Sequence, residues 1–448
     1  MSDIMTNGAF LTEYKKDMIK AVKRINPDWK KKEIEEVLDD MMKERIQNPK
    51  VIADNNYTKE ERETTLLSVL DWYIEREPII AGNFTFYKKQ EELLNPVAKM
   101  LDNKLQERSR VKKEMFRANE LGDTKLYKYK DRMQGNVKKT VNSYYGGSGA
   151  PTSAFYSEWS GPATTASAQE AISTAEQMFE GLVANNYFFI NLSELMDWCN
   201  VIFKDFKDDD YDEDVKIVGP DTTIERLYDR ILNHEDNDEE ILSNFIYSLS
   251  EKECTYIYYK NNLIEFIDRN DFIKDLIYDV FDNIENLDYV EEKDDWFKEV
   301  PSKYKKDFQG KGPKDYNKFV NKMYFMDPNS PPENIEELLK EINYYCNKYV
   351  FCNYLSFDRI YRLKNFKRWT VTVIDTDSNI LSLDTIINYI LDEIIGNRDF
   401  GRKYENNEFI AVNLITYILT DAVKKVLYTY SEYANMSEGY KERIAMKN

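Results

Sequence analysis

The chain has 448 residues and, with 62 basic and 81 acidic residues, a formal net charge of −19 at pH 7. Its four cysteines form no CxxC pair, and its one histidine, His234, lies in an acidic run; this composition excludes disulfide frameworks, Cys/His zinc sites and histidine-dependent nucleophilic catalysis. The length favours two or three domains, and the absence of a leader sequence or a long apolar run predicts a soluble, cytoplasmic protein without a membrane partner.

The charge is unevenly distributed along the chain. Residues 201–300 contain 11 basic and 30 acidic residues, which accounts for the whole net charge, whereas residues 99–146 contain 13 basic and 6 acidic residues. Lysine and arginine supply most of the non-specific affinity of proteins for nucleic acids, so the negative net charge does not exclude a nucleic-acid contact at the basic segment. The acidic segment would repel DNA, and we expect solvated surface there, or a face turned away from DNA or mimicking it.

The first 80 residues predict a small helical platform. Apolar residues recur at helical spacing over residues 12–24, 31–46 and 59–76. The last of these helices is expected to begin after a capping signal at Tyr57-Thr58.

A β-hairpin and a helical hairpin are predicted next. Residues 79–89 alternate apolar and polar side chains around Gly82-Asn83, which indicates two short strands. Two long helices are then expected at Pro96–Glu120 and Thr124–Ser143, because Leu121-Gly122-Asp123 supplies a helix-ending glycine and an N-cap between them. A connection of three residues makes these two helices antiparallel neighbours.

The remaining chain is predicted to be mostly helical. Residues 145–162 are rich in Gly, Ser, Pro and aromatics and indicate an irregular stretch, and residues 164–183 form a helix with many small side chains. Residues 190–365 read as an acidic helical block. Residues 368–383 return to alternation and predict a second β-hairpin, followed by two or three helices over 385–440.

The acidic run Asp208–Asp214 resembles a calcium-binding loop only superficially. It lacks the sixth-position glycine and the twelfth-position glutamate of such loops. Solvated surface is therefore the favoured interpretation of this run.

The basic side chains of the helical hairpin can be placed from helix geometry. Arg108 and Lys112 share a helix face, as do Gln134 and Lys138, because residues four apart are neighbours. At about 1.5 Å per residue, Arg108 and Lys138 lie at heights that differ by about 3 Å. Converging guanidinium and ammonium groups suit a triphosphate. On spacing alone, a solvated basic face remains the favoured alternative.

The tip of the second β-hairpin carries the sequence Asp375-Thr376-Asp377. Two carboxylates two residues apart in an extended segment point to the same side, where they can hold a hard divalent cation. Aspartates are also common turn residues, and taken alone the turn is the favoured interpretation.

The order of these features resembles that of family B DNA polymerases. Lys138–Gly146 has the form K-x3-N-S-x-Y-G of the family's fingers motif, motif B, and Val373–Ser378 resembles motif C, the palm hairpin with its D-T-D-S tip. Upstream, Arg108-x3-Lys112 followed by Gln134-x3-Lys138 is similar to the fingers helices of that family. The resemblance is specific over residues 82–169 and 370–383 and is closest to the polymerases of large phages, so the expected location is the host cytoplasm.

The resemblance implies roles for residues of the fingers. Arg108, Lys112 and Lys138 would hold the triphosphate of the incoming nucleotide, with Asn142 beside it. Tyr145-Gly146 would lie under the nascent base pair, with the tyrosine on its minor-groove side.

The resemblance also implies a palm with a two-metal site. Asp377 would be a ligand of catalytic Mg²⁺ ions and Asp375 its weaker neighbour. The implied reaction is attack of a primer 3′-hydroxyl on the α-phosphate of a deoxynucleoside triphosphate, directed by primer-template DNA. Other features of the family are absent. Nothing in residues 1–82 matches the D-x2-S-L-Y-P motif that carries its second metal-binding aspartate, and neither an exonuclease D-x-E pattern nor a thumb K-K-x-Y motif is found.

We therefore expect the fingers and partial palm of a split family B polymerase, with an α+β and mostly helical fold. Other chains would supply the exonuclease domain, the missing aspartate that completes the metal site, and the thumb. A non-catalytic interaction or scaffold protein derived from a polymerase is the alternative, and an unrelated metal-dependent hydrolase is a more distant one. The expected divisions are a platform at 1–80, fingers at 81–147, a palm helix region at 148–189, an acidic insertion at 190–365 and a palm hairpin with following helices at 366–448.

Overall fold

In the computed structural model, the described residues are 9–25, 27–45, 48–55, 60–89, 91–92, 96–203, 206–207, 211–284, 334–352, 367–375, 378–396, 400 and 404–441. They fall into two compact units. The first unit contains Met1–Thr12, Gln47–Ala171 and Tyr430–Ile444, and the second contains Glu13–Ile46, Ile172–Thr429 and Ala445–Asn448. Each unit is therefore assembled from separate stretches of the sequence.

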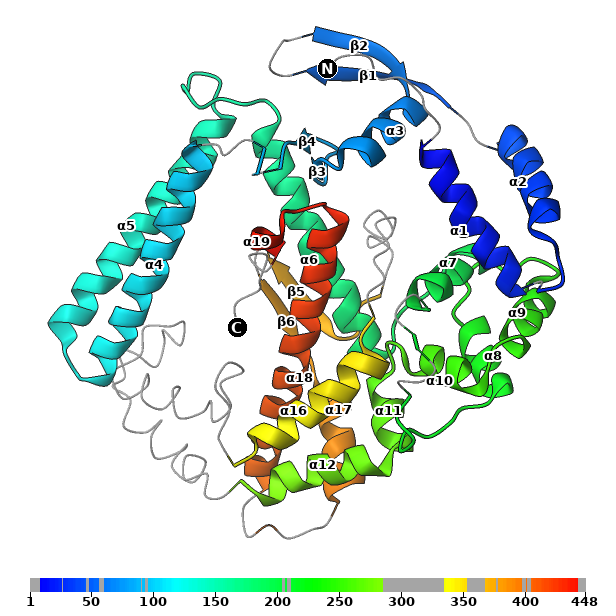
Figure 1. Ribbon diagram of the computed structural model, residues 1–448. Coiled ribbons are helices and arrows are strands. Elements are labelled where there is room, and N and C mark those ends of the chain that lie inside the picture. Colours follow the sequence, from blue (N-terminus) through cyan, green and yellow to red (C-terminus); the bar gives the residue numbers. More distant parts are fainter. Residues whose placement is uncertain are drawn as a thin grey trace. The chain divides into compact units, whose positions relative to one another are not determined.

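The fold is α+β and mostly helical, which confirms the predicted class. The described strands form three separate antiparallel pairs and no larger sheet (Figure 1). Within the described ranges, every helix is too short or too polar to cross a membrane.

The first unit begins with a β-hairpin that the sequence did not predict. Strands β1 (Lys50–Asn55) and β2 (Glu60–Thr65) pair in register, with Val51 opposite Thr64. The helix expected over 59–76 is therefore shorter, because α3 spans Leu66–Arg76. Its N-cap is Thr65, whose hydroxyl accepts a hydrogen bond from the Ser68 amide, and not Thr58. Pairing with β1 overrides the helical tendency of the glutamate-rich segment.

The helical hairpin of the first unit was predicted closely. Helix α4 spans Pro96–Glu120 as expected, and α5 spans Thr124–Gly149, six residues longer than predicted. Gly122 has a positive φ of 71°, a conformation that glycine adopts without strain. The Asp123 carboxylate caps α5 by accepting from the Lys125 and Leu126 amides. Helix α6 (Ser160–Ala184) also begins earlier than predicted, so the irregular stretch is shorter.

The short strands β3 (Ile79–Ile80) and β4 (Phe86–Tyr87) form the predicted hairpin around Gly82. The Gly82 amide donates to the Ser167 hydroxyl at 3.0 Å. A Cβ atom on Gly82 would lie 2.8 Å from the Ala166 carbonyl carbon and 2.7 Å from Cδ of Glu170. Glycine is therefore needed where this turn meets the first part of α6.

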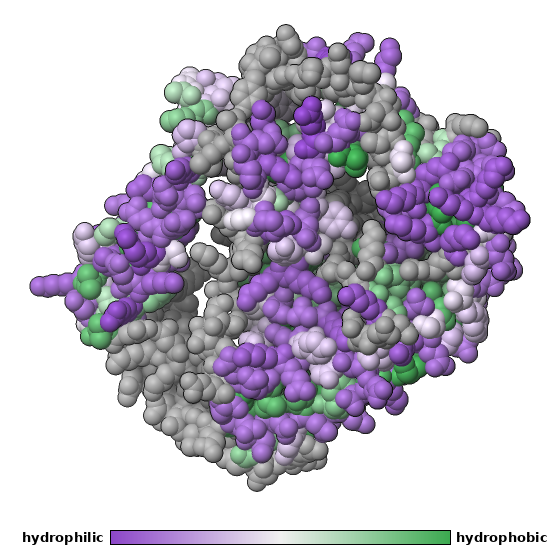
Figure 2. Space-filling model, in the orientation of Figure 1, coloured by the Kyte–Doolittle hydropathy of each residue, from purple (hydrophilic) through white to green (hydrophobic). Residues whose placement is uncertain are grey.

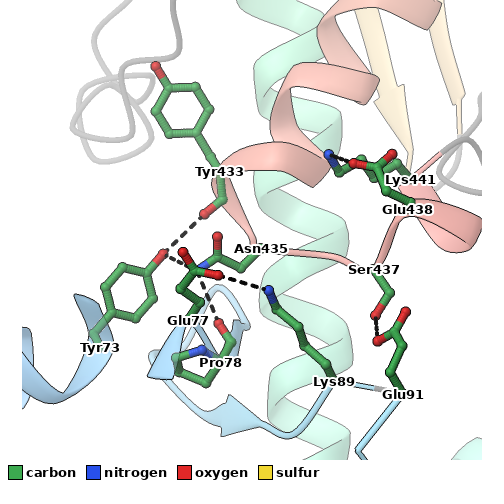
Figure 3. A network of polar contacts seen from close by, with 10 residues as sticks. All are labelled: Tyr73, Glu77, Pro78, Lys89, Glu91, Tyr433, Asn435, Ser437, Glu438 and Lys441. Atoms are coloured by element: carbon green, nitrogen blue, oxygen red, sulfur yellow. Dashed lines mark hydrogen bonds and ion pairs between the residues drawn. The ribbon is translucent and has the colours of Figure 1, made fainter. Parts of the chain in front are cut away.

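Residues from the end of the chain complete the first unit. The Ile80 amide donates to the Ala434 carbonyl, and the Asn435 side chain donates to the Tyr73 hydroxyl and the Pro78 carbonyl. Figure 3 shows the contacts of Asn435, together with the bond from Ser437 to Glu91 at 2.6 Å. The end of α18 (Tyr404–Tyr433) and the short α19 (Glu438–Lys441) thereby lie against segments near residue 80.

The second unit is mainly helical and contains most of the large buried side chains. Its core includes the fully buried rings of Trp198, Tyr259, Tyr349, Phe266 and Phe281. It contains most of α1 (Ala9–Ile25) and of α18, and the end of α6. Its other described elements are α2 (Lys31–Arg45), α7 (Leu192–Ile202), α8 (Pro220–Tyr228), α9 (Asp238–Tyr247), α10 (Glu251–Tyr259), α11 (Leu263–Arg269), α12 (Asp271–Asp282), α16 (Glu336–Tyr345), the π-helix η2 (Cys346–Val350), β5 (Val371–Asp375), β6 (Ser378–Leu381), α17 (Asp384–Tyr389) and the π-helix η5 (Ile390–Ile395).

The described residues of the acidic block are mostly helical, with short loops between the helices, and residues 285–333 are among those that lie outside the described ranges. One detail of its prediction was wrong. Asp212, expected to be solvated, accepts from the Tyr349 hydroxyl at 2.9 Å and forms an ion pair with Lys348 at 2.7 Å. The residues 208–210 of the same run lie outside the described ranges. Asp212 therefore ties its loop to η2.

No disulfide joins the four cysteines. Cys346 is buried, which raises the pKa of its thiol above the ordinary value. His234 is exposed and lies against the ring of Tyr228, with the ring centroids 4.3 Å apart.

Candidate functional site

The α4–α5 hairpin of the first unit has a defined register. Val111, Met115 and Ala118 of α4 are buried, as is Val137 of α5. The Arg108 guanidinium donates from Nε to Oε1 of Gln134 at 3.3 Å. Arg108 therefore lies beside Gln134, which is one helical turn from Lys138 along α5. Figure 1 shows α4 and α5 side by side as an antiparallel pair.

Gln134 also fixes the direction of this contact. Its amide nitrogen donates to Asp131 at 3.1 Å, which leaves its oxygen toward Arg108. The half-buried Arg108 side chain is thus oriented by a neutral partner that cannot neutralise its charge. Among the described residues no carboxylate forms an ion pair with Arg108, which leaves the cation to an anion on this side of the hairpin.

The three cationic residues of the predicted nucleotide site lie on one side of the hairpin. Helical residues advance by about 100° each, so Arg108 lies about 60° and Lys112 about 100° from Val111 around α4. Around α5, Lys138 lies about 100° from Val137 in the same rotational sense. Because the helices are antiparallel, the same sense on both corresponds to the same side. We call this side, with Arg108, Lys112, Lys138 and Asn142, the inner face.

The residues of the inner face differ in exposure. Arg108 and Lys112 are half-buried, whereas Lys138 and Asn142 are exposed. Two glutamates of α4 pair with lysines outside the inner face, since Glu107 is bound by Lys104 at 2.7 Å and Glu114 by Lys130. These ion pairs hold the pKa of both carboxyl groups below the ordinary value, chiefly through the hydrogen bond from each lysine.

The end of α5 is joined to α6 by polar contacts within the first unit. The Tyr145 hydroxyl shares a 2.7 Å hydrogen bond with the Thr165 hydroxyl, and its ring remains half-exposed. The Ser157 amide donates to the Ser148 carbonyl at 2.9 Å, which closes the connection between the two helices. Gly146 is exposed and has open space around its Cα. Tyr145 is therefore held by its hydroxyl while a face of its ring stays accessible.

The predicted palm hairpin belongs to the second unit. Strands β5 and β6 are antiparallel, and their last pair is Asp375 opposite Ser378. Asp377 and Thr376 lie outside the described residues, and the side chain of Asp375 is not described. The structure therefore places the backbone of Asp375 at the end of strand β5, paired with Ser378 of β6.

A buried carboxylate that sequence reasoning missed anchors the beginning of β5. Glu180 of α6 is fully buried, and its carboxylate accepts from the Thr370 amide at 2.8 Å and the Val371 amide at 2.7 Å. It also accepts from the Trp369 amide and from the Asn186 side chain. Four N–H donors thus surround one carboxylate.

A second glutamate lies one turn earlier on α6. Glu176 is buried and pairs with Arg368 at 3.5 Å, and burial is the main cause that raises its pKa above the ordinary value. Two glutamates four residues apart in a helix otherwise rich in small and apolar residues were the signal in the sequence. Their partners, almost 200 residues later, were not apparent from that signal.

The donor chemistry at the palm hairpin suits a hard cation, since Asp375 and Asp377 offer carboxylate oxygens. Among the described residues, no cluster of three or more acidic, histidine or cysteine side chains could hold a metal. A site with two metal ions at this hairpin would therefore need carboxylates beyond those that the described residues bring together.

The sequence was also compared with known families and proteins. A family model described as Divergent Family B DNA polymerase matches residues 5–448. The matched range contains the α4–α5 hairpin, the acidic block and the β5–β6 hairpin. No curated protein and no solved structure matches the chain.

Proposed function

The chain belongs to the divergent family B DNA polymerases, and from this premise we propose that it provides the fingers and part of the palm for template-directed nucleotidyl transfer. The observation that carries the proposal is the inner face, where Arg108 is oriented by a neutral glutamine and shares one side of two rigid helices with Lys112 and Lys138. Cations held in this way complement the charge of a triphosphate before it arrives.

The inner face would bind and orient the nucleotide. The Arg108 fork would take two phosphate oxygens, and the ammonium groups of Lys112 and Lys138 would balance the charge of the pyrophosphate as it leaves. Asn142, one turn beyond Lys138, would contact the same nucleotide. Tyr145, held through Thr165, would offer its exposed ring to the nascent base pair.

The palm hairpin would bring Asp375 and Asp377 to the reacting phosphate. Mg²⁺ ions, when bound, supply charge that stabilises the attacking and leaving oxygens. The role of this chain would be to hold the hairpin rigidly, through the buried contacts of Glu180 at the start of β5. We propose that partner chains contribute the further carboxylate, the exonuclease and the thumb, and that primer-template DNA is bound by the complete assembly.

The proposal is tested by comparing Lys138→Ala with Lys139→Ala. The two lysines are adjacent and exposed on α5, but only Lys138 lies on the inner face. Loss of a charge-assisted contact worth about 1.5–3 kcal/mol should raise the apparent nucleotide constant or slow incorporation by about 10- to 150-fold for Lys138→Ala. Lys139→Ala should behave as the wild type toward nucleotide.

The measurement is primer extension by the chain reconstituted with its partner chains, with nucleotide and salt titrated separately. Equal nucleotide dependence of both variants, with a loss of DNA affinity alone, would contradict a triphosphate site on the inner face. Asp377→Ala should abolish extension without preventing assembly. Absence of nucleotide binding by the reconstituted wild type would instead support the non-catalytic alternative.

A further inference from the structure

The α4–α5 hairpin carries a second group of cations on the side opposite the inner face. Seen around each helix from Val111 or Val137, these residues lie about 100–180° away in the opposite rotational sense to Arg108 and Lys138. We call this side the outer face. Its eight cations, all of them exposed, are Lys99, Arg110, Lys113, Arg117, Lys125, Lys128, Arg132 and Lys139.

The outer face is not neutralised by the described part of the protein. No described carboxylate forms an ion pair with any of its eight cations, whereas Glu107 and Glu114 are paired with Lys104 and Lys130 nearer the buried seam. Figure 2 shows that hydrophilic residues cover most of the visible face of the hairpin, with hydrophobic ones at the end where its helices connect. In a chain with a net charge of −19, this concentration of positive charge is local.

An exposed aromatic ring lies among the cations near the connected end. Tyr129 is 58% exposed and lies on α5 between Lys125 and Arg132, one turn from each. Leaving this large ring in water is unfavourable for the isolated protein, so a partner that covers it would gain apolar contact.

We propose that the outer face binds single-stranded DNA, as the path of the unpaired template strand. Rows of lysine and arginine complement the phosphates, and Tyr129 is placed to stack on an unpaired base. A duplex would satisfy the cations but would leave the ring without a base to stack on. The assignment of the strand as template rests on the proposed function, whereas the binding surface itself is tested without nucleotide.

The test uses the purified full chain and a fluorescent 20-nucleotide oligothymidine, with binding followed by anisotropy between 50 and 200 mM NaCl. The triple variant Lys125→Gln, Lys128→Gln, Arg132→Gln removes three outer-face cations. The control Lys20→Gln, Lys31→Gln, Lys32→Gln makes the same charge change on the exposed helices α1 and α2. Circular dichroism checks that each variant folds.

Each phosphate contact with a single strand contributes about 0.7 to the slope of log affinity against log salt. The triple variant should therefore lower the slope by about 2, and the control should leave it within about 0.7 of wild type. Tyr129→Ala should weaken binding by about 5- to 150-fold with the slope unchanged, because stacking is not ionic.

Three results would overturn the proposal: no binding of the oligothymidine by wild type at 50 mM NaCl, equal slopes for the triple variant and its control, or a duplex of the same length that binds as tightly as the single strand. A separate nucleotide titration distinguishes this surface from the inner face. The triple variant should keep the nucleotide constant of wild type, and Lys138→Ala should keep its affinity for the oligothymidine, so either site can fail alone.

Discussion

Replacing Glu180 with glutamine should destabilise the second unit and loosen the start of β5. The carboxylate accepts from the amides of Trp369, Thr370 and Val371 at 2.7–3.1 Å and from the Asn186 side chain at 2.5 Å, with no exposure to solvent. Glutamine has nearly the same shape but replaces one accepting oxygen with a donor.

The size of the destabilisation follows from the hydrogen-bond donors that the substitution leaves without an acceptor. If the glutamine oxygen keeps the bonds from Thr370 and Val371, its NH₂ group faces the Asn186 amide, which is itself a donor. One buried donor without a partner costs about 1–3 kcal/mol. For a unit of this size, such a loss lowers the melting temperature by about 2–12 °C.

Thermal unfolding followed by circular dichroism measures this change, and Glu225→Gln, on the exposed surface of α8, is the matched control. Hydrogen exchange adds a local readout: peptides covering 367–381 should exchange faster in Glu180→Gln, while peptides from the middle of α18 should not. A variant with the wild-type melting temperature and unchanged exchange over 367–381 would refute the anchoring role of Glu180.

Two further predictions concern the first unit. Gly82→Ala should lower the free energy of unfolding by about 1–3 kcal/mol in denaturant titrations, because its Cβ would overlap Ala166 and Glu170. The control Gly135→Ala, which has open space in the middle of a helix, should raise the free energy of unfolding by up to about 1 kcal/mol. Equal effects of the two substitutions would contradict the close approach of Gly82 to α6. Burial raises the pKa of Glu170 above its ordinary value of 4.5, against the smaller lowering effect of the Tyr430 hydroxyl, so the folded state holds more protons than the unfolded state above pH 4.5. Wild-type stability should therefore fall, relative to Glu170→Gln, as the pH rises from about 4.5 through the folded-state pKa, and parallel stability curves for the two proteins would rule out this effect.

Local signals in the sequence were sufficient for the helical hairpin. Pro96 and Leu121-Gly122-Asp123 set the bounds of α4 and the start of α5 through residues next to one another, and the structure has the same bounds. Helical periodicity likewise placed Arg108 and Lys138 on one side. That they bind a nucleotide stays a prediction.

Features that depend on distant partners could not be read from the sequence. The segment from Glu60 to Thr65 is compatible with a helix, and its pairing with Lys50–Asn55 makes it a strand. In the sequence, Glu180 is an ordinary polar residue of a helix. Its anchoring role becomes apparent only in the fold, where the amides of Trp369–Val371 donate to its carboxylate. The contacts of Asn435 with Tyr73 likewise join residues 362 positions apart.

The first unit is assembled from stretches that lie far apart in the sequence, and this has a consequence for biosynthesis. The Tyr73 hydroxyl donates to the Tyr433 carbonyl, 360 positions later, and the Ile80 amide finds its acceptor at Ala434. A ribosome adds roughly 5–20 residues per second, so these partners leave it roughly 20–70 s apart. The α4–α5 hairpin, whose contacts are local, can form during that interval, but the hydrogen bonds of Tyr73 and Ile80 with Tyr433 and Ala434 cannot. Translation that stalls before Tyr430 would leave the segments near Tyr73 and Ile80 without these partners, as a target for chaperones and proteases.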